Sequence, residues 1–451
     1  MNPEIFREYD IRGIADTELP DTDAELIGKA YGTLIHNNGG SVVVLGKDNR
    51  ISGPRIFEAL KKGILSTGIN IIFIGEIPTP LLYYAVHKLD MDGGISVTAS
   101  HNPPEFNGFK VLIGKEAIYG EKIQEIYKVA ESGKFAVGEG TIEEKFLDDI
   151  YLDEIVSNVK IVKKLKVVID AGNAMASELA PKLLKQLGLD PICLFCEKDS
   201  SFPNHQPDPV QEKNVLDLKK KVLEEKADLG IAFDGDVDRI GVLDEKGNLI
   251  YGDKLLGVFS EDLLKRKPGS KIIFEVKCSQ SLDEWIRKKG GVPIMWKTGH
   301  SLIKAKMKEE NAVLAGEMSG HMFFTENWYG FDDALLAAAK ILEIVSHSGK
   351  KLSEIVGQMP EYVSSPEYRV ECPDNKKGIV VKAMTDKYKK LYPKSVTIDG
   401  IRIIFDYGWA LVRQSNTQSK IILRFEAKTK QNLEEIKSVI MPEVEELIKE
   451  A

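Results

Sequence analysis

Short runs of β-branched and other apolar residues alternate with helical patterns over most of this 451-residue chain. The first run covers residues 41–46, a helical pattern follows over 54–68, and a second run covers 70–75. The same alternation returns from residue 166 and again from residue 271. Strands that alternate with helices form βαβ units, so the pattern predicts three α/β domains of similar build.

The last part of the chain has a different pattern. Three strand-like runs follow one another at residues 396–405, 408–415 and 420–427. A helix is then predicted to begin near Asn432, with Glu435 placed for a capping box. Consecutive strands followed by a helix predict a small α+β domain.

Two proline-bearing stretches, 199–210 and 360–375, have little periodicity and are predicted to be loops, the second of them at a domain boundary. A chain of this length exceeds what one hydrophobic core supports, so several domains are expected.

Composition excludes some classes of partner. The formal net charge is -8 and no run of like charges forms a tail, which argues against a nucleic-acid binder and favours a small-molecule partner. No stretch approaches the ~20 apolar residues of a membrane span, and the N-terminus has no leader pattern, so we expect no membrane association and a cytoplasmic location. Four cysteines are too few for a disulfide scaffold, and the Cys193/Cys196 pair has no second ligand pair for zinc.

The segment TASHNP contains a serine in a constrained turn. Ser100 follows a strand-like run of small residues and precedes Pro103, which cannot continue a helix or a central strand. Serine is a weak nucleophile unless a base, a metal or a prior charge activates it, and His101 and Lys110 are the local candidates. The alternative is a serine turn with a locally packed histidine, and the hexapeptide alone does not decide between them.

The segment DGDVDR places three carboxylates at alternate positions after an apolar strand-like run. In an extended strand Asp234, Asp236 and Asp238 would be ~6.6 Å apart, so the backbone must curl if they are to share an ion, and Gly235 permits that. Oxygen-only ligands favour a hard cation such as Mg²⁺. A calcium loop is the rival interpretation, but Arg239 stands where such a loop needs glycine and no helix pattern brackets it.

The segment GEMSGH is predicted to bind hydroxyl groups. Glu317 and Ser319 are two residues apart and can both face a ligand that flanking glycines allow to approach. His321 is a candidate general acid or base. For His321, and equally for Lys277 and His300, a structural role is the alternative.

The segment RQSNT is predicted to bind an anion. Arg413 offers a planar fork to a phosphate, and Ser415, Asn416 and Thr417 add short donors around it. A polar hairpin loop is the alternative for this motif taken alone.

These four motifs, in this order and spread over the whole chain, resemble the α-D-phosphohexomutase superfamily, and the chain is most similar to its bacterial and archaeal phosphomannomutase/phosphoglucomutases. FREYDIRG, GKDNR, FPNHQPDP and KTGHS are supporting matches. GEMSGH is the form of this motif typical of the mannose/glucose enzymes, whereas phosphoglucosamine mutases usually carry glutamine in place of Met318. Ser419 departs from the family, which normally has proline at that place.

The resemblance implies three similar α/β domains with mixed sheets plus a C-terminal α+β domain, arranged around a central cleft, each domain contributing one loop. Four domains are expected in chain order. Residues 1–146 form the domain with the phosphoserine loop, 147–251 the domain with the metal-binding loop, 252–362 the domain with the sugar-binding loop, and 363–451 the domain with the phosphate-binding loop.

The resemblance also implies that Ser100 is phosphorylated in the resting enzyme. A phosphoserine beside the three aspartates would be a cluster of negative charge, so Mg²⁺ is expected, held by Ser100, Asp234, Asp236 and Asp238, while Arg239 offsets developing charge. Tyr9, Arg12, Lys277 and His300 are implied ligand contacts.

The implied reaction interconverts the 1-phosphate and 6-phosphate of mannose, glucose or both, through the phosphoserine and a hexose 1,6-bisphosphate that is both intermediate and activator. Lys110 and His321 are the candidate base and acid. The expected partners are small-molecule sugar phosphates, and the expected assembly is a monomer or a weak homo-oligomer. The alternatives are a phosphoglucosamine mutase, a metal-dependent serine phosphatase, and a non-catalytic calcium or sugar-phosphate binder.

Overall fold

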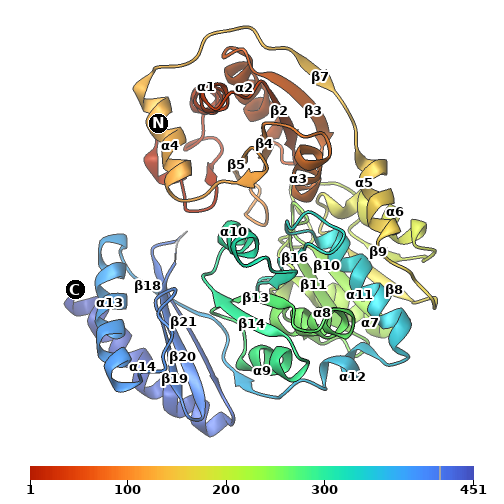
Figure 1. Ribbon diagram of the computed structural model, residues 1–451, viewed down its shortest axis with the longest axis vertical. Helices are drawn as coiled ribbons and strands as arrows, with labels where there is room; N and C mark the ends of the chain where they lie inside the picture. The colour runs from red at the N-terminus through yellow and green to blue at the C-terminus, as the bar shows by residue number, and fades with distance from the viewer. Residues whose placement is uncertain (416–417) are drawn as a thin grey trace. The chain divides into compact units, whose positions relative to one another are not determined.

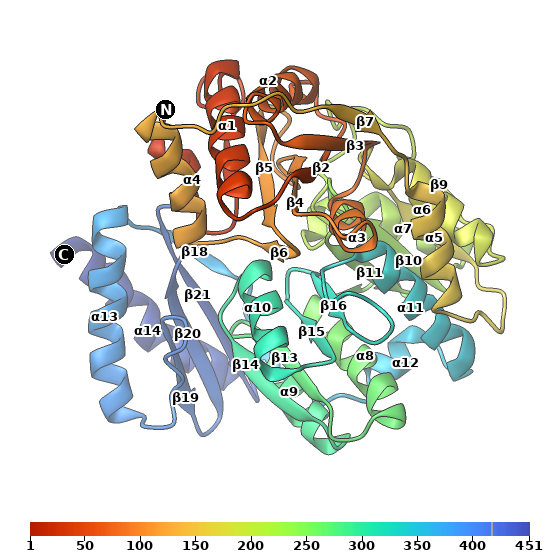
Figure 2. The same cartoon turned by 45° about the horizontal axis from the view of Figure 1, so that its top comes forward.

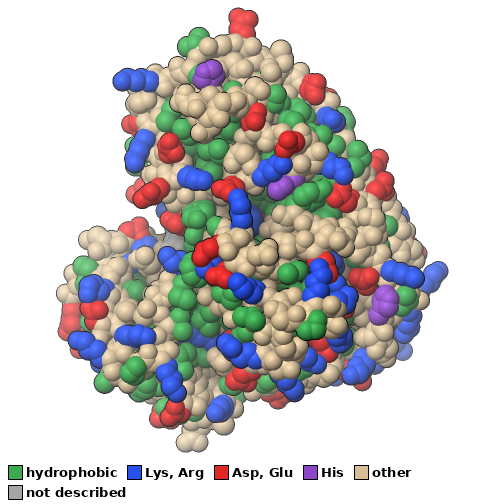
Figure 3. All heavy atoms as spheres, viewed as in Figure 1, with side chains coloured by type: hydrophobic (Ala, Val, Ile, Leu, Met, Phe, Trp, Pro, Cys, Tyr) green, Lys and Arg blue, Asp and Glu red, His purple; other side chains and the backbone are tan. Residues whose placement is uncertain are grey.

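A computed structural model describes residues 1–415 and 418–451. Two compact units divide the chain: unit 1 contains residues 1–255 and 319–355, and unit 2 contains residues 256–318 and 356–451. Acidic and basic side chains are interspersed over the visible face of each unit (Figure 3). Within the described residues no helix combines the length and apolar character needed to cross a bilayer.

The first sheet of unit 1 is mixed, with strand order β1-β5-β4-β2-β3-β7 and β6 paired with β5 (Figure 1). β4, β2, β3 and β7 are parallel to one another, whereas β1 and β5 run antiparallel to their neighbours. The apolar faces of α1, α2 and α4 and of the sheet form one buried core. The elements of this region are η1(Pro3–Ile5), β1(Ile11–Ile14), α1(Asp21–Asn37), β2(Val42–Lys47), α2(Gly53–Leu65), β3(Asn70–Glu76), α3(Thr79–Lys88), β4(Gly93–Val97), β5(Phe106–Ile113), β6(Glu116–Ala117), α4(Glu121–Ser132) and β7(Ile142–Glu144).

The second sheet of unit 1 has the order β12-β11-β10-β8-β9 and is also mixed. β9, β8 and β10 are parallel, and β10, β11 and β12 form an antiparallel meander. α7 packs on β8 and β10, and α11 packs on α5, α6 and β11 (Figure 2). The elements are α5(Asp148–Ser157), β8(Val167–Asp170), α6(Ala176–Gln186), β9(Ile192–Leu194), η2(Glu212–Val215), α7(Leu216–Glu225), β10(Leu229–Phe233), β11(Ile240–Asp244), β12(Leu249–Ile250), β16(Met322–Phe324), α11(Ala334–Ser348) and α12(Leu352–Val356).

Unit 2 contains three parallel strands in the order β14-β13-β15 and an antiparallel sheet in the order β17-β21-β20-β19, with β18 paired to β21. α13 and α14 contact each other and the antiparallel sheet. The elements are α8(Gly252–Arg266), β13(Lys271–Glu275), α9(Gln280–Lys288), β14(Val292–Trp296), α10(His300–Glu310), β15(Leu314–Gly316), β17(Val363–Ser364), β18(Tyr368–Glu371), α13(Asp374–Leu391), β19(Ile401–Phe405), β20(Gly408–Gln414), β21(Lys420–Ala427) and α14(Lys430–Glu450).

A buried arginine joins the two halves of unit 2. The Arg402 guanidinium lies 3.8 Å from the centre of the Trp409 ring and donates to the carbonyl oxygens of Val276 and Cys278, both at 2.7 Å. Burial lowers the pKa of Arg402 to about 10. The C-terminal sheet is therefore fixed directly to the end of β13.

The predicted fold class, three α/β domains and a C-terminal α+β domain with mixed sheets, is confirmed. Two local predictions are wrong. The stretch 360–375 is not all loop, because β17 and β18 lie within it and pair with β21. The last helix is capped by Thr429, whose Oγ1 accepts from Asn432 N at 3.2 Å, while Glu435 accepts from the Tyr407 hydroxyl.

Candidate active site

The serine of TASHNP lies in the turn that follows β4. Ser100 is only 2% exposed and its backbone is left-handed, with φ 50°. Its N–H donates to Thr98 Oγ1 at 3.0 Å, and the Thr98 hydroxyl donates in turn to Asp48 Oδ2 at 2.7 Å. A left-handed non-glycine residue is strained, and these bonds hold the turn in that conformation.

Arg50 holds the rest of the same turn. This role was not assigned to it from the sequence. Its buried guanidinium donates to the carbonyl oxygens of Ser100 at 2.8 Å and Asn102 at 2.6 Å, and its Nε donates to Asp48 Oδ2 at 3.2 Å. It also reaches the carbonyl oxygens of Pro103 at 2.6 Å and Phe106 at 3.0 Å. One side chain therefore donates to four backbone carbonyl oxygens, and these hydrogen bonds hold the turn in one conformation.

The three aspartates of DGDVDR meet between β10 and β11. Each is fully buried, and one ligand atom from each of Asp234, Asp236 and Asp238 lies within 4.8 Å of the other two. The backbone curls as the spacing requires, with Val237 at φ 65°. A Cβ at Gly235 would lie 2.2 Å from the Ser100 carbonyl oxygen, so glycine is needed where the two turns approach.

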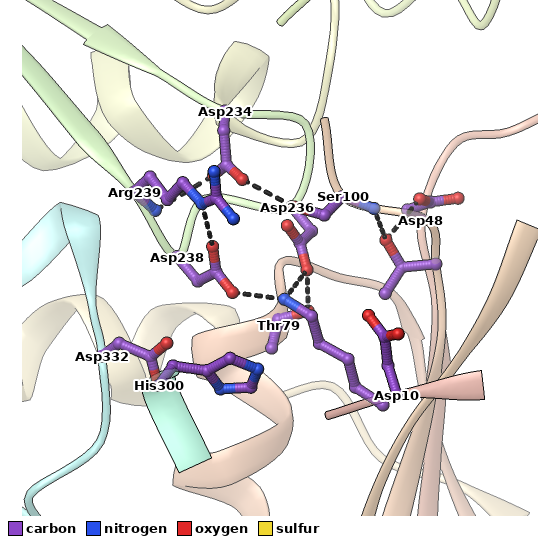
Figure 4. Close-up of polar contacts among 12 residues, drawn as sticks. Asp10, Asp48, Thr79, Ser100, Asp234, Asp236, Asp238, Arg239, His300 and Asp332 are labelled. Carbon is purple, nitrogen blue, oxygen red and sulfur yellow. Dashed lines mark hydrogen bonds and ion pairs between the residues drawn. The ribbon is translucent and has the colours of Figure 1, made fainter. Parts of the chain in front are cut away.

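The serine hydroxyl is bonded into this carboxylate triad. Ser100 Oγ donates to Asp234 Oδ2 at 2.8 Å (Figure 4). Asp236 Oδ2 accepts from Lys110 Nζ at 2.6 Å and from the Thr79 hydroxyl, and Asp238 Oδ2 accepts from the same ammonium. Thr79 begins α3, and its N–H also donates to the Asp236 carbonyl oxygen at 2.9 Å.

Burial and mutual charge set the pKa values of the triad. Burial, and then repulsion by Asp238 and Asp236, raise the pKa of Asp234 well above its usual value. Burial also opposes the charge on Asp238, but Lys110, His321 and Arg239 together outweigh it and lower the pKa of that carboxyl. The pKa of Lys110 is raised well above its usual value because attraction to Asp236 and Asp238 outweighs its burial, so the amine is held as an ammonium.

The triad fits a hard divalent cation. Its donors are all carboxylate oxygens, and among the described residues Asp236 Oδ1 and Asp238 Oδ1 are buried without a hydrogen-bond partner. Buried acceptors left in this way are costly, whereas a cation would satisfy both. The predicted metal ligands Asp234, Asp236, Asp238 and Ser100 are thus brought together.

The remaining residues around the serine come from the N-terminal motif and from the 199–210 loop. His101 Nδ1 lies 3.1 Å from Ser100 Oγ, and burial and the charge of Arg239 lower the pKa of His101 well below its usual value. Gln206 donates to the His101 carbonyl oxygen. Arg12 donates to Asn102 Oδ1 at 2.7 Å, which brings it to the serine turn, and Tyr9 is half-buried two residues before β1 begins.

His321 links the GEMSGH segment to the metal-binding turn. Its Nε2 accepts from Arg239 Nε at 2.9 Å, and the Arg239 N–H donates to Asp234 Oδ1 at 3.0 Å. His321 Nδ1 lies 2.9 Å from Asp332 Oδ2. Ser319 is half-buried in the turn just before. Asp332 carries no motif, and only its spacing from His321 along the chain could have drawn attention to it.

Unit 2 contains the other part of GEMSGH and the lysine and histidine predicted to bind sugar. Glu317 Oε1 accepts from the Gly299 N–H at 2.6 Å, which places it beside the first turn of α10, where His300 lies 3.2 Å from Lys304 Nζ. Lys277 Nζ is 3.5 Å from a carboxylate oxygen of Glu275 and from one of Glu367. These neighbours raise the pKa of Lys277 despite its burial.

The phosphate-binding prediction falls on the end of β20, which contains Arg413, and on the residues that follow it. Arg413 Nε donates to Asp399 Oδ2 at 2.9 Å, and the Thr298 N–H donates to the same oxygen at 3.1 Å. Asp399 therefore orients the arginine fork against the segment before α10. Lys377 Nζ donates to the Ser415 carbonyl oxygen at 2.8 Å. Asn416 and Thr417 lie outside the described residues.

The predicted site residues thus form two groups, each within one unit. The serine, metal and proton-transfer candidates with Tyr9, Arg12 and Ser319 belong to unit 1, and the remaining sugar and phosphate candidates belong to unit 2. No role was assigned from the sequence to the residues that hold them in place. Four of these lie in quoted segments, namely Asp48, Arg50, Thr98 and Gln206, and four lie outside those segments, namely Thr79, Glu275, Asp332 and Asp399.

Comparisons with known proteins cover nearly the whole chain. Models of phosphoglucomutase/phosphomannomutase α/β/α domains I, II and III match residues 3–137, 149–247 and 251–362, and the C-terminal domain model matches 367–443. A phosphomannomutase/phosphoglucomutase of Pseudomonas aeruginosa is 43% identical, over 96% of this chain and 94% of that protein. A phosphoglucomutase of Neisseria gonorrhoeae is 42% identical, over 96% of this chain and 95% of that protein.

A solved structure supports the same grouping. The crystal structure of a phosphoglucomutase/phosphomannomutase family protein from Burkholderia thailandensis superimposes with a TM-score of 0.94 at 40% identity, covering 99% of this chain and 98% of the other. Four consecutive domain matches and relatives above 40% identity over nearly the full length leave one assignment. The chain belongs to the phosphoglucomutase/phosphomannomutase family.

Proposed function

We propose that this protein is a phosphohexomutase that interconverts hexose 1-phosphate and hexose 6-phosphate, with mannose, glucose or both as the sugar. The observation that carries the proposal is the hydrogen bond from Ser100 Oγ to Asp234, which puts the motif serine at the edge of a buried carboxylate triad. The relatives, a phosphomannomutase/phosphoglucomutase and a phosphoglucomutase among them, support the same activity.

In this proposal Ser100 carries the phosphoryl group and unit 1 performs the transfer. The left-handed turn and the bonds from Arg50 keep Oγ in one place, which favours in-line attack because little reorganisation is left for the reacting state. Arg239 offsets the charge that develops on the phosphoryl oxygens. His101 lies against Oγ, and Lys110 and His321 are the candidates for proton transfer.

A divalent cation, Mg²⁺ in this proposal, would be held by Asp234, Asp236, Asp238 and Ser100. When bound, it neutralises the carboxylates and polarises the transferring phosphoryl group. The oxygen-only donors and the two buried carboxylate oxygens without protein hydrogen bonds support a hard cation.

Most of the residues proposed to recognise the substrate belong to unit 2, whereas Ser319, Tyr9 and Arg12 belong to unit 1. Arg413, Ser415, Asn416 and Thr417 would grip the phosphate already on the sugar, and Glu317 with Ser319 would bind its hydroxyl groups. Lys277, His300, Tyr9 and Arg12 are proposed as further contacts. A metal-dependent phosphatase would need the serine and the metal but would have no use for this second phosphate grip.

The proposed cycle has two half-reactions. The phosphoryl group passes from Ser100 to the free hydroxyl of the sugar phosphate and gives a hexose 1,6-bisphosphate. This intermediate turns end for end, so that its other phosphate returns to Ser100 and leaves the isomeric monophosphate. The same bisphosphate would restore an enzyme that has lost its phosphoryl group.

Further parts of the proposal concern organisation. We propose domains at 1–146, 147–251, 252–362 and 363–451, a cytoplasmic location, and a monomer or weak homo-oligomer. The separate family matches to four consecutive regions support the division. Limited proteolysis followed by N-terminal sequencing tests the boundaries, and light scattering across a concentration series tests the assembly.

The direct test of the reaction incubates the purified protein with mannose 1-phosphate, glucose 1-phosphate or glucosamine 1-phosphate, with Mg²⁺ and a trace of hexose 1,6-bisphosphate. We expect the 6-phosphates of mannose, glucose or both, with little inorganic phosphate. Stoichiometric phosphate release without isomer would instead identify a phosphatase. Preference for the glucosamine substrate would move the assignment to a phosphoglucosamine mutase.

The metal site is tested by chelation. We expect EDTA to abolish isomerisation, Mg²⁺ to restore it, and Mg²⁺ to raise the melting temperature of the wild type. Asp236→Asn should lose that thermal shift, because it removes one anionic ligand. The control Asp244→Asn, which changes a buried aspartate outside the triad, should keep it.

A further inference from the structure

Two cysteines lie where β9 ends, at the edge of the second sheet of unit 1. Cys193 is in β9 and is exposed, and Cys196 follows the strand and is half-buried. The chain bends between them at Phe195, whose backbone is left-handed with φ 52°. The Cys196 thiol donates to the Leu194 carbonyl oxygen at 3.5 Å. The bend therefore turns the second thiol back towards the residues around the first.

This arrangement suits a disulfide between the two cysteines. A disulfide needs Cα atoms about 4.4–6.8 Å apart. Residues three apart reach that separation across a bend, whereas in an extended strand they would be about 10 Å apart. Burial, and then the side chain of Cys193, raise the pKa of Cys196 well above its usual value, so the two side chains are neighbours. An exposed thiol with a second thiol beside it can react with an oxidant and then close the bond within the chain.

The two residues between the cysteines are bonded to the loop that follows β8. The Ala171 N–H donates to the Leu194 carbonyl oxygen at 3.1 Å. The Asn173 N–H donates to the Phe195 carbonyl oxygen at 2.9 Å. The shape of the bend and the position of this loop therefore depend on each other.

The same loop contacts the turns of the candidate active site. The Met175 N–H donates to the carbonyl oxygen of Gly235, within DGDVDR, at 3.3 Å. Asn49 Nδ2 donates to the Asn173 carbonyl oxygen at 3.0 Å, and the next residue, Arg50, holds the serine turn. Both the aspartate turn and the support of the serine turn are thus one hydrogen bond away from the loop that the bend holds.

A second connection runs through the 199–210 loop. The Phe195 and His205 rings lie edge to face, with their centres 5.3 Å apart. The next residue, Gln206, donates to the carbonyl oxygen of His101, beside Ser100. A change in the bend would therefore reach the serine turn from this side as well.

We propose that Cys193 and Cys196 form a modification site, which a low-molecular-weight disulfide oxidises reversibly to an intrachain disulfide, and that the oxidised state slows the mutase reaction. The thiol chemistry stands apart from the proposed function, and the effect on turnover rests on it. A disulfide has no S–H, so Cys196 loses its bond to the Leu194 carbonyl oxygen. The sulfur atoms must also approach to about 2.05 Å, which moves the residues between them.

The oxidation balances as two exchange steps. The Cys193 thiolate attacks one sulfur of the small disulfide, forms a mixed disulfide and expels one small thiolate. The Cys196 thiolate then attacks Cys193 Sγ, closes the intrachain bond and expels the second small thiolate. The two protons released by the cysteines pass through water to the two small thiolates. Two protein thiols are thus oxidised, and one small disulfide is reduced to two thiols.

The first test uses the full-length protein in buffers that contain glutathione and glutathione disulfide at increasing ratios of disulfide to thiol. Samples are quenched in acid, unfolded and alkylated, and their peptides are identified by mass. We expect Cys193 and Cys196 to lose alkylation together and to regain it with dithiothreitol. Cys278 and Cys372, both buried in unit 2, are the internal controls and should remain thiols. Free thiols at 193 and 196 across the whole series would overturn the proposal.

Two variants test the order of the steps. Cys196→Ser lacks the second thiol, so we expect the reaction to stop with one glutathione on Cys193. Cys193→Ser leaves only the half-buried thiol, and we expect much slower reaction with glutathione disulfide. Wild-type protein that also stops with glutathione on Cys193 would show that the intrachain bond does not form and would overturn the proposal.

Turnover is then compared between reduced and oxidised protein. We expect kcat of the oxidised wild type to fall about 2- to 30-fold, the range for changes along a network of contacts, and to recover with dithiothreitol. Cys193→Ser should keep its turnover through the same treatment. Unchanged turnover of fully oxidised wild type would overturn the effect on the active site. A protein without mutase turnover in either state would remove the proposed function, and the alkylation result would still decide the modification site.

Discussion

The two units present their polar groups in different ways. Unit 1 gathers three buried aspartates around one ammonium and places the reactive hydroxyl on a left-handed turn, with a second left-handed residue at Val237. In unit 2 the two cations of the candidate site are matched by neighbouring carboxylates, Lys277 by Glu275 and Glu367, and Arg413 by Asp399. The left-handed non-glycine residue recorded for the described part of this unit is the helix cap Asn311.

This difference shows where strain and uncompensated charge are concentrated. Buried like charges and strained turns cost stability and persist where they prepare a reaction, whereas matched pairs on loops suit reversible binding. We therefore expect substitutions in unit 1 to reduce turnover and those in unit 2 to weaken substrate binding.

The largest effect is expected for Lys110→Met. Removing the ammonium leaves buried carboxylates without their partner, so we expect about 3–5 kcal/mol of lost stability and at least a 10³-fold loss of activity. Lys115→Met is the matched control, because its partner Asp90 is largely exposed and solvent screens the pair, so this variant should lose little stability. Urea unfolding measures both. Equal stability of the two variants would contradict the contrast between the units.

Arg413→Ala should act on binding. Loss of charge-assisted hydrogen bonds to the substrate phosphate, each of about 1.5–3 kcal/mol, predicts a KM about 10- to 100-fold higher. Phosphorylation of Ser100 by a large excess of bisphosphate should still reach completion. Arg287→Ala, an exposed helix pair with Asp283 in the same unit, is the control. A fall in kcat at unchanged KM would mean that unit 2 also takes part in the chemical step.

The smallest expected effects are on the pH dependence of folding stability. A rise in pH should destabilise through a carboxyl of unit 1 and stabilise through a carboxyl of unit 2. Burial raises the pKa of Asp333 to about 7, so the folded state resists ionisation and its stability should fall as pH rises from about 4 through 7. Although burial opposes it, the charges of Lys277, Arg369 and Arg413 together lower the pKa of Glu367 to about 2. Stability from that carboxylate is therefore present above about pH 4.5 and is lost as pH falls towards 2.

Two amide variants test these signs. Asp333→Asn should be more stable than the wild type at pH 8, because it removes a buried charge while its oxygen can still cap α11. Glu367→Gln should be less stable at pH 6, and each change should be on the order of 1–3 kcal/mol. Thermal unfolding at pH 4, 6 and 8 measures both. Identical pH profiles for the two variants would contradict the assignment.

The fold class could be predicted because each apolar run and each helical pattern reports its own local structure. The chemical centre could be predicted because its residues are adjacent in sequence, as in Ser100 with His101, or in the three aspartates. The serine turn follows β4 and the aspartate turn follows β10, which belong to two different sheets, so their meeting could not be read from local pattern. The strands β17 and β18 were missed because their local pattern is weak and their pairing with β21 decides their structure. The last helix begins earlier than predicted because Thr429 provides its cap.

The roles of the supporting residues could not be predicted, because each role depends on contacts with residues far away in the sequence. Arg50 acts on a turn 50 residues away, and Thr79 bonds to a carboxylate 157 residues away. Asp332 shows no motif at all and is identified by its distance from His321. The segment GKDNR, which contains Arg50, was recognised in the sequence, but the sequence does not show which turn this buried cation holds.

The central claim is that one side-chain oxygen, Ser100 Oγ, holds and exchanges the phosphoryl group. The most direct measurement incubates the protein with hexose 1,6-bisphosphate and Mg²⁺ and locates the added mass by peptide mapping. We predict one phosphoryl group on the peptide that contains Ser100, none in Ser100→Ala, and undiminished labelling in the exposed-serine control Ser132→Ala. A Ser100→Ala protein that still interconverts the hexose phosphates at the wild-type rate would contradict the account.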